Sequence, residues 1–387
     1  MGWTTIDPPS RVDLDACVTC GLCLPVCPTY RLTGDETASP RGRLVAIDAV
    51  DQGMAQVDHR FGEIIDFCLQ CRACETACPS LVPFGSVIEK ATAEIAAQIP
   101  RRGSLLRRFA VSHALSTPLL LRSGSIAIGA AQRLGIPSQG LRRIPLPQQS
   151  ARGGMWGPQD APTATLFLGC VADAWFSEIH KATVEVLLAA GYSVVAPKDQ
   201  TCCGALAAHD GFVDDAEVMA RTNRAALRDS DIIVVNVAGC GAHLKEDPEL
   251  GTKVMDVTEV VACAIEEGRL PTLAANGQSV AVQDPCHLEH GQGIVDEPRL
   301  ILRAGGYVVL DADPGGLCCG AAGTYLIDHR ETSAELGRMK AATVAATGAK
   351  LVASANAGCE MQLRRFLDDG FEVKHPVELY ARQLRDA

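Results

Sequence analysis

Eight of the 17 cysteines of this chain fall into two short runs with one shared spacing, C-x2-C-x2-C-x3-C-P. Three cysteines at steps of three place their thiolates around a tight loop. Such a loop suits a cubane 4Fe-4S cluster, and the fourth ligand has to come from elsewhere. The spacing therefore predicts two 4Fe-4S clusters in one N-terminal domain. The two runs are Cys17, Cys20, Cys23 and Cys27, and Cys68, Cys71, Cys74 and Cys78.

The last cysteine of each run is expected to bind the cluster of the other run, as it does in two-cluster ferredoxins. Zinc sites usually pair C-x2-C with C-x2-C and have no use for a third cysteine at the next step. Four disulfides would need an oxidising compartment, and the first residues do not look like a signal peptide. The predicted ligand sets are Cys17, Cys20, Cys23 and Cys78 for the first cluster, and Cys68, Cys71, Cys74 and Cys27 for the second.

Length and composition narrow the class of protein. A chain of 387 residues with 47% hydrophobic and 21% charged residues is expected to form several globular domains. Its net charge of −11 and its 4% aromatic content offer neither a positive field nor a stacking platform, which argues against nucleic-acid binding. Because no stretch of about 18 apolar residues occurs, we expect a cytoplasmic protein, with at most a peripheral contact on the inner face of the membrane.

The second half of the sequence alternates strand-like and helix-like segments. Such alternation is typical of mainly parallel sheets covered by helices. We therefore expect a multidomain α+β and α/β chain, with an α-helical ferredoxin-type domain followed by α/β units. Strands are expected at 164–169, 192–197, 231–237, 279–284, 307–312, 350–355 and 371–375, and helices at 177–191 and 214–229.

A second cysteine pattern occurs twice in this α/β half. Each copy has one cysteine after a strand, a Cys-Cys-Gly-Ala segment 32 residues later, and an Ala-Gly-Cys segment after another strand. The glycine lets the backbone approach a bulky ligand, and strand ends place the sulfurs at one edge of the sheet. The pattern predicts a duplication and a further cluster or metal. Its candidate ligands are Cys170, Cys202, Cys203 and Cys240 in the first copy, and Cys286, Cys318, Cys319 and Cys359 in the second.

The segment between the two cysteine groups is basic. From Ile95 to Gln159 it has nine arginines and no Asp, Glu or Lys. Docking on an acidic partner is the favoured interpretation, and contact with an anionic membrane or a solvated helical hairpin are the alternatives. The expected domains are residues 1–95 with two clusters, 96–160 as a helical connector and linker, 161–272 as the first cysteine-rich repeat and 273–387 as the second.

With these motifs in place, the sequence resembles the glycolate oxidase iron-sulfur subunit family. The segments CVTCGLCLPVCPTYRLTGDETASPRGRL, DPCHLEHGQGI, LCCGAAGTYLIDH and ANAGCEMQL carry this likeness. The repeats are also similar to the CCG domain found in heterodisulfide reductases and in anaerobic glycerol-3-phosphate dehydrogenases. The resemblance implies an oxidoreductase subunit that passes electrons from partner FAD-containing subunits, which oxidise glycolate or D-lactate, to an acceptor such as quinone.

The repeats depart from the full CCG pattern, which ends in C-x2-C. His243 and Gln362 stand where the fifth cysteine of each repeat would be. This departure argues against disulfide reduction, although a CCG domain that is itself the redox active site remains the alternative. No FAD or NAD is expected on this chain, because its glycine-rich segments lack the nucleotide-binding spacing. Cys263 is expected to be a small buried apolar residue, and no catalytic residue is assigned.

Overall fold

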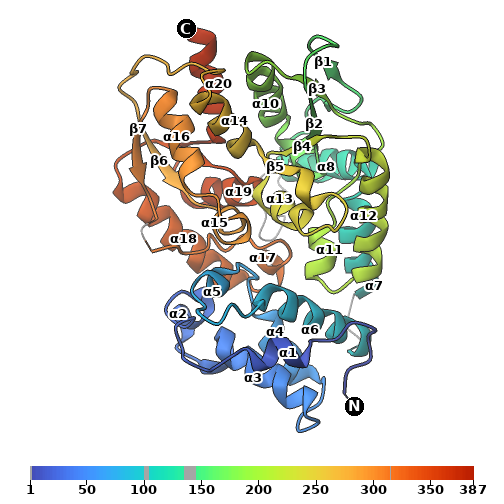
Figure 1. Cartoon of the computed structure of the whole chain (residues 1–387). Coiled ribbons are helices and arrows are strands. Elements are labelled where there is room, and N and C mark those ends of the chain that lie inside the picture. Colours follow the sequence, from blue (N-terminus) through green and yellow to red (C-terminus); the bar gives the residue numbers. More distant parts are fainter. Residues whose placement is uncertain (1, 100–103, 135–144, 314) are drawn as a thin grey trace.

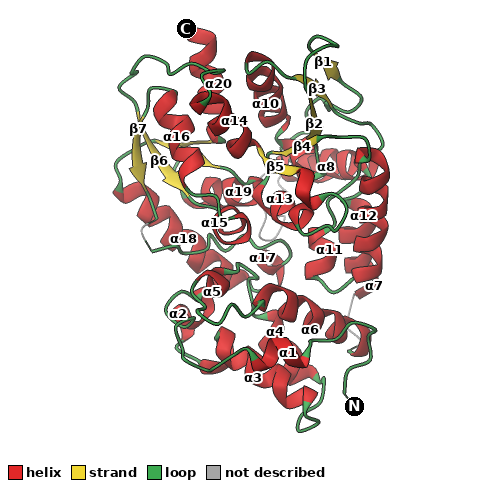
Figure 2. Ribbon diagram, in the orientation of Figure 1, coloured by secondary structure: helices red, strands yellow, loops and turns green. Residues whose placement is uncertain are grey.

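The computed structural model describes residues 2–99, 104–134, 145–313 and 315–387. Figure 1 shows three units: a helical N-terminal unit at the bottom and two α/β units side by side above it. The ribbon in Figure 2 shows that strands occur in the two upper units. The expected fold class, a helical ferredoxin-type domain followed by a duplicated α/β domain, is confirmed.

The N-terminal unit packs its helices around one apolar core. Helix α3 begins at Pro40 after Ser39, whose side chain accepts a hydrogen bond from the Gly42 amide. Its buried face joins α4 and α6 through Ile47, Ile65 and Ile88. The elements are α1 (Arg11–Asp15), α2 (Pro28–Thr33), η1 (Glu36–Ala38), α3 (Pro40–Asp51), α4 (His59–Asp66), α5 (Ala73–Thr76) and α6 (Phe84–Gln98).

The described part of the arginine-rich connector contains the helical segments α7 (Ser104–Arg108), η2 (Phe109–Ala114) and α8 (Pro118–Arg133). Arg107 donates hydrogen bonds to Asp210 in the first α/β unit and to Asp328 in the second. Arg108 pairs with Asp215. These two arginines therefore bind carboxylates of their own chain, where the sequence favoured a partner protein. Arg101, Arg102, Arg142 and Arg143 lie outside the described residues.

The first α/β unit has a five-stranded sheet with the order β1-β3-β2-β4-β5. All its pairings are parallel except that of the edge strand β1 with β3. Strands β1 and β5 were not expected from the sequence. The unit contains β1 (Met155–Trp156), β2 (Thr163–Phe167), α9 (Val171–Trp175), α10 (Ser177–Ala189), β3 (Ser193–Val195), α11 (Ala205–His209), α12 (Val213–Leu227), β4 (Ile232–Val235), α13 (Ala238–Lys245), η3 (Gly251–Lys253), β5 (Val254–Asp256) and α14 (Val257–Glu266).

The second α/β unit has a fully parallel sheet with the order β7-β6-β8-β9. This order matches β3-β2-β4-β5 of the first unit strand for strand, as a duplicated half-domain requires. The unit contains β6 (Ser279–Gln283), α15 (Cys286–Gln292), α16 (Asp296–Ala304), β7 (Val308–Asp311), α17 (Tyr325–Asp328), α18 (Arg330–Ala346), β8 (Leu351–Ser354), α19 (Ala357–Phe366), β9 (Glu372–Lys374) and α20 (Pro376–Asp386).

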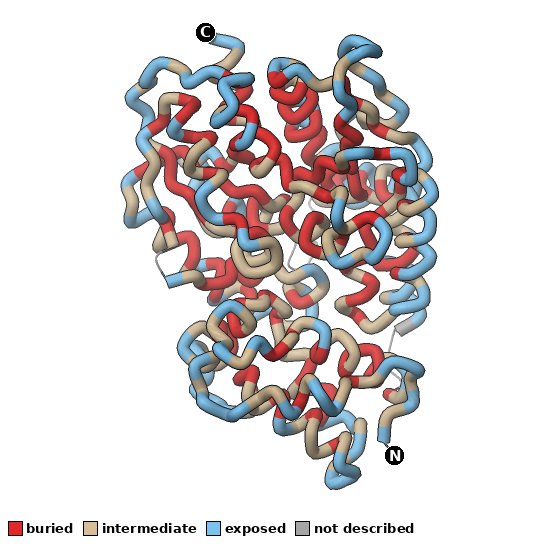
Figure 3. The backbone as a smooth tube through the Cα atoms, viewed as in Figure 1, coloured by how far each residue is buried: buried red, intermediate tan, exposed pale blue. Residues whose placement is uncertain are grey.

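The two α/β units share their largest core. Leu166 and Leu187 of the first unit belong to one buried cluster with Ile301, Val377 and Tyr380 of the second. Figure 3 shows this buried backbone running across the boundary between the two upper units. In the part of the chain that the structure describes, no helix is long and apolar enough to cross a membrane. The domain boundaries at 95, 160 and 272 remain predictions.

Candidate iron-sulfur sites

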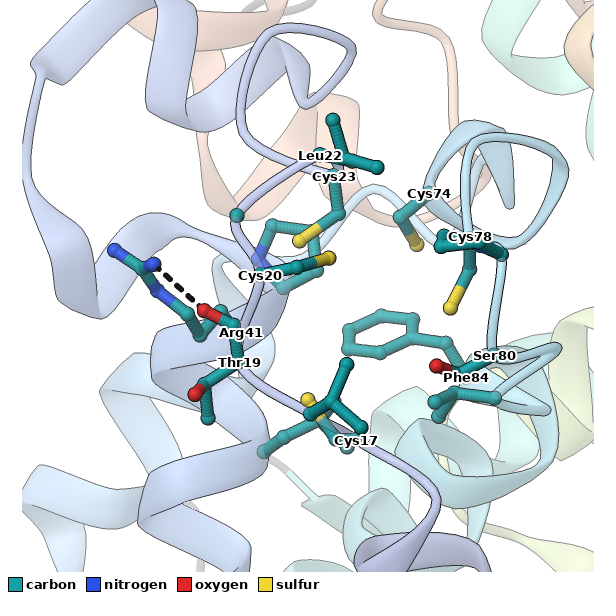
Figure 4. Close-up of a pocket in the computed structure, with 16 residues that line it drawn as sticks. Cys17, Thr19, Cys20, Leu22, Cys23, Arg41, Cys74, Cys78, Ser80 and Phe84 are labelled. Atoms are coloured by element: carbon teal, nitrogen blue, oxygen red, sulfur yellow. Dashed lines mark hydrogen bonds between the residues drawn. The ribbon is translucent and has the colours of Figure 1, made fainter.

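A hollow opens on the N-terminal unit, and cysteines from both runs line it. Cys17, Cys20 and Cys23 belong to the first run, and Cys78 and Cys74 to the second. Figure 4 shows the sulfur atoms of Cys17, Cys20, Cys23 and Cys78 around one central space. Thiols that surround a hollow suit a cluster of several atoms. The structure thus brings Cys78 to the first run, as crossed ligation requires, and the ligation itself stays a prediction.

The two cluster loops have the same unusual backbone. Thr19 and Gln70, each two residues after the first cysteine of a run, have left-handed φ angles of 55° and 51°. Gly21 and Arg72, two positions further on, have φ angles of 84° and 64°. Such alternation can turn backbone N–H groups toward a negatively charged centre. In the second loop the Gln70 amide donates to the Cys68 sulfur at 3.4 Å, which is a direct sign of this arrangement.

The second predicted quartet is more deeply buried than the first. Cys27, Cys71 and Cys74 are buried, Cys68 is partly buried, and Cys20 of the first quartet is exposed. Burial raises the pKa of the Cys71 and Cys74 thiols, and the nearby Cys68 and Cys27 thiols raise it further. Cys27 therefore lies beside the second run. Because these thiols stay protonated at neutral pH, binding of iron there must release protons.

A buried arginine that the sequence analysis missed supports the second quartet. Arg43 is 1% exposed, and it donates to the Ile64 carbonyl at 3.0 Å and to the Thr29 hydroxyl at 3.2 Å. Thr29 in turn contacts the Cys27 sulfur at 3.3 Å. A buried cation favours a negatively charged cluster nearby. Arg43 shares a buried helix face with Ile47 and Val50, and this spacing was the signal that could have identified it.

The second cluster loop packs directly on the second α/β unit. Leu69 and Cys71 form one buried apolar cluster with Leu317 and Cys318, and Cys286 packs against it. Cys286 and Cys71 are close enough that Cys286 raises the pKa of Cys71. Figure 1 shows α5, which follows this loop, next to α15 and α17. The second predicted cluster site and the second CCG quartet are therefore neighbours.

Each CCG repeat gathers its four cysteines at the carboxyl edge of its sheet. In the first repeat, hydrogen bonds link the thiols of Cys170, Cys202, Cys203 and Cys240 in that order. In the second, Cys286, Cys318, Cys319 and Cys359 are linked in the same way. The sulfurs touch, at 3.3 Å for Cys170 and Cys202 and at 3.0 Å for Cys319 and Cys359. A cluster bound between these sulfurs would have to move them apart. Binding of a cluster or metal by the CCG cysteines therefore stays a prediction.

The residues at the missing fifth cysteine positions lie against the Cys-Cys-Gly segments. A Cβ added to Gly204 would lie 3.5 Å from Nε2 of His243. Gln362 is buried and donates to the Ser333 carbonyl at 2.9 Å, beside Gly320. His243 is therefore placed near the first quartet, and Gln362 has a structural role in the second. Within residues 2–99, 104–134, 145–313 and 315–387, no three His, Cys, Asp or Glu side chains are arranged to bind one metal ion.

Gly320→Ala is expected to lower the free energy of unfolding by about 2–3 kcal/mol. Gly320 has a φ angle of +79°, and an added Cβ would lie 2.7 Å from the Ser333 carbonyl oxygen. Gly348 is a matched control, because its φ angle is +78° with nothing within 4 Å. Gly348→Ala should cost about 1 kcal/mol, the backbone contribution alone. Equal losses in denaturant titrations of the two variants would contradict the predicted steric effect.

The helices that pack behind the two CCG quartets differ from each other at one position, which is charged in the second repeat only. Ala216 in α12 and Ser333 in α18 approach the glycines of their Cys-Cys-Gly segments, and seven residues later come Asn223 and Lys340. Asn223 donates to the Cys202 carbonyl at 2.8 Å. Lys340 is fully buried and forms an ion pair with Asp313, which is also buried. The second repeat thus has a buried charge pair where the first has a neutral amide.

Histidines meet where all three units come together. His209 of α11 and His287 of α15 stack with their ring centroids 5.9 Å apart. His209 Nδ1 lies 2.8 Å from the Glu89 carboxylate of α6. Burial lowers the pKa of His209, but Glu89 more than offsets this and leaves it above its ordinary value of 6.5. The sequence had no signal for the pair of Glu89 and His209, because the two residues lie 120 positions apart.

Glu89→Gln should destabilise the protein by about 1 kcal/mol or less near pH 5.5, since the pair is partly exposed. Because the His209 pKa is raised in the folded protein, its protonation stabilises the folded state fully below pH 6.5. This contribution is lost as the pH rises through the pKa of His209 in the folded state. The Glu89 pKa is lowered below 4.5, so its contribution is lost as the pH falls through that lower value. Unfolding measured from pH 4 to 9 should show the two proteins converging above neutral pH. A difference in the free energy of unfolding that stays constant over this pH range would count against the pair of Glu89 and His209.

Cys263 corrects one expectation. It is exposed on α14, where its sulfur donates to Glu267 at 3.3 Å, and it is not the buried apolar residue that its helical context suggested. The helix α14 turns its valines inward instead, and Val257, Val260 and Val261 belong to the shared core. Cys263 lies in none of the quartets and therefore serves as a control for cysteine substitutions.

Comparisons with known proteins match this geometry. Residues 13–82 match the family described as a 4Fe-4S dicluster domain, and residues 164–245 and 280–364 match the family described as a cysteine-rich domain. The chain is 32% identical to the probable glycolate oxidase iron-sulfur subunit of Bacillus subtilis (strain 168), over 90% of this chain and 88% of the relative. The chain belongs to the glycolate oxidase iron-sulfur subunit family.

Other relatives of this chain agree with the assignment. The glycolate oxidase iron-sulfur subunit of Escherichia coli (strain K12) is 31% identical, over 96% of this chain and 94% of the relative. A fumarate reductase (CoM/CoB) subunit of Methanothermobacter marburgensis is 32% identical, over 52% of this chain and 42% of the relative. The relatives named as glycolate oxidase subunits are parts of oxidoreductases, and the two matching domain families support iron-sulfur clusters in this chain.

Proposed function

We propose that this chain is the electron-transfer subunit of a hydroxy-acid dehydrogenase complex of the glycolate oxidase type. In this proposal FAD-containing partner subunits oxidise glycolate or D-lactate, and this chain passes single electrons on to an acceptor such as quinone. In the same proposal the complex works in the cytoplasm and contacts the membrane at most peripherally, at its inner face. Two relatives named as glycolate oxidase iron-sulfur subunits, each similar over most of its length, support this assignment.

The placement of the cysteine sites is the observation that carries the proposal. One site, with the exposed Cys20, opens to the surface of the N-terminal unit. The next is buried, and its Cys71 lies against Cys286 of the second CCG repeat. Sites ordered from the surface to the interior suit a relay that receives electrons from a docked protein. The proposed clusters are bound by Cys17, Cys20, Cys23 and Cys78, and by Cys68, Cys71, Cys74 and Cys27, with a further cluster or metal in the CCG repeats.

The test is reduction of the anaerobically purified chain by its donor. The chain is co-expressed with the FAD-containing subunits, its iron is counted, and the visible absorbance of its clusters is followed after addition of glycolate, D-lactate or glycerol 3-phosphate. Glycolate or D-lactate should bleach the absorbance when the flavoprotein is present, and neither should do so with the chain alone. No bleaching by either hydroxy acid in an iron-replete complex would refute the proposal.

A second candidate function places the redox chemistry on the CCG repeats themselves, as in a heterodisulfide reductase. The similarity to the fumarate reductase (CoM/CoB) subunit over half of this chain supports it. His243 and Gln362 at the fifth cysteine positions count against it. Oxidation of the reduced chain by a disulfide would favour this candidate. Reduction of the clusters by glycerol 3-phosphate alone would instead point to a subunit like that of anaerobic glycerol-3-phosphate dehydrogenase.

A further inference from the structure

Helix α3 carries two arginines that lie beside the two predicted cluster sites. Arg41 lines the hollow of the first site and donates to the Thr19 carbonyl of the first cluster loop at 3.1 Å (Figure 4). Arg43, two positions further on, donates to the Thr29 hydroxyl, which contacts the Cys27 sulfur of the second predicted quartet at 3.3 Å. Each site therefore has one guanidinium group from the same helix next to it.

The charge of Arg41 is neutralised within the chain. Its Nε forms an ion pair with Glu36 at 2.8 Å, and its Nη2 donates to the other oxygen of the same carboxylate at 3.0 Å. The side chains of Arg41 and Glu36 are 30% and 47% exposed, so water screens both charges further. The first site therefore experiences little net positive charge from Arg41.

Arg43 is buried and has only neutral partners. Its acceptors are the Ile64 carbonyl and the Thr29 hydroxyl, and no carboxylate of the described residues forms an ion pair with it. Glu75, in the second cysteine run, is already bound to Arg72 at 2.7 Å. A guanidinium group stays protonated even when it is buried, and a buried charge without a counter-ion destabilises the fold. Arg43 therefore needs an anion that the chain itself does not supply.

The second predicted cluster would supply this anion. Arg43 reaches the quartet at Cys27 through Thr29, and it also lies near Cys68: burial raises the pKa of the Cys68 thiol, and Arg43 is close enough to oppose this rise. Four thiolates bring negative charge to a cubane cluster, and reduction adds one more electron. A buried cation therefore stabilises the reduced form of a neighbouring cluster more than the oxidised form.

We propose that Arg43 is the counter-ion of the second cluster and makes that cluster the easier of the two to reduce. The inference rests on the proposed electron-transfer function and deepens it by giving the relay a direction. One electron from the partner flavin enters the exposed first site and passes to the second, so the first site is reoxidised as the second is reduced. No bond forms or breaks in this step. Electrons thus collect at the buried site, which lies against the second CCG repeat.

The experiment is a redox titration of the full chain, purified anaerobically with its clusters and followed by electron paramagnetic resonance. Of the two reduction steps of the N-terminal unit, Cys27→Ala should lose the one at higher potential and Cys78→Ala the one at lower potential. Arg43→Gln should move the higher step down, so that the ratio of reduced to oxidised cluster at a fixed potential falls roughly tenfold, about 59 mV for one electron. The lower step should stay in place.

Two further variants separate the charge of Arg43 from its hydrogen bonds. Arg43→Lys keeps the charge and loses the forked guanidinium group, so its higher step should stay closer to that of the unaltered chain than the step of Arg43→Gln does. Arg60→Gln is the matched control, because Arg60 is an exposed arginine of α4 that pairs with the exposed Glu63 at 3.4 Å. Neither step should move in the control.

Unchanged steps in Arg43→Gln, or equal shifts in Arg43→Gln and Arg43→Lys, would show that this arginine only joins α2 to α4 and would overturn the proposal. A shift of the lower step would overturn it as well. If Arg43→Gln loses the iron of the second site, retention of that iron by Arg43→Lys would support the need for a charge, and its loss from both would refute it. The titration uses no hydroxy acid and no flavin. The expected order of steps in a chain that no hydroxy acid reduces would therefore refute the proposed donor and leave the role of Arg43 standing.

Discussion

Anaerobically purified Cys78→Ala protein is expected to contain about four fewer irons per chain and to lose its more accessible cluster. Although Cys78 belongs to the second cysteine run, it lines the open hollow with the first. In the unaltered protein a chelator should remove iron in a fast phase, from the site with the exposed Cys20, and in a slow phase, from the buried site of Cys71 and Cys74. Cys78→Ala should lose the fast phase.

The reciprocal variant makes this test decisive. Cys27→Ala should lose the slow phase, because Cys27 lies beside the buried second run. If each run instead bound a cluster with its own four cysteines, the two variants would show the opposite losses. Cys263→Ala is the control, and it should keep both phases because this exposed cysteine lies outside the quartets. Alanine is preferred to serine, whose hydroxyl oxygen could still bind iron.

Lys340→Met is expected to lower the free energy of unfolding by about 3–5 kcal/mol, the usual cost of leaving one partner of a buried ion pair alone. The Lys340 and Asp313 side chains are 0% and 3% exposed. Burial lowers the pKa of Lys340 to about 8, so the ammonium is still charged at pH 7. Methionine keeps the length of the side chain but leaves the Asp313 carboxylate without its cation. Denaturant unfolding at pH 7 measures the effect.

Two further variants show whether the buried charge causes this loss. Arg338→Met removes an exposed partner of Glu335 on the same helix and should change stability by no more than about 0.5 kcal/mol. Adding Asp313→Asn to Lys340→Met removes the second buried charge and should restore part of the lost stability. A double variant no more stable than Lys340→Met alone would show that packing, and not the unpaired carboxylate, accounts for the loss.

The sequence predicted the parts of the fold that depend on local spacing. Each of the seven expected strands overlaps an observed strand, because each combines an apolar run with a nearby turn signal. The four cysteines of each CCG copy meet in space, because parallel strands place their carboxyl ends at one edge. The duplication was also readable from the identical interval of 32 residues, and the matching order of the two sheets agrees with it.

The missed features depend on contacts between distant segments. Strand β5 has only three residues, Val254–Asp256, and exists because it pairs with β4. Glu89 and His209 meet because the N-terminal unit packs against the first repeat, which no local pattern encodes. The arginines of the connector were interpreted by composition alone, whereas the acceptors of Arg107 come from two different repeats. Spacing along the sequence therefore predicted which cysteines come together better than it predicted the residues that surround them.

The last helix, α20, completes a core that begins much earlier in the chain. Its Val377 and Tyr380 are fully buried and belong to the cluster that contains Leu187 of α10. Because ribosomes make proteins from the N-terminus, the apolar face of α10 stays uncovered until residues 376–386 have been translated. Nascent chains are therefore exposed to aggregation through nearly half of their synthesis, and chaperone binding in this interval would protect them. A premature stop before α20 would yield a product for proteolysis even though every cysteine was present.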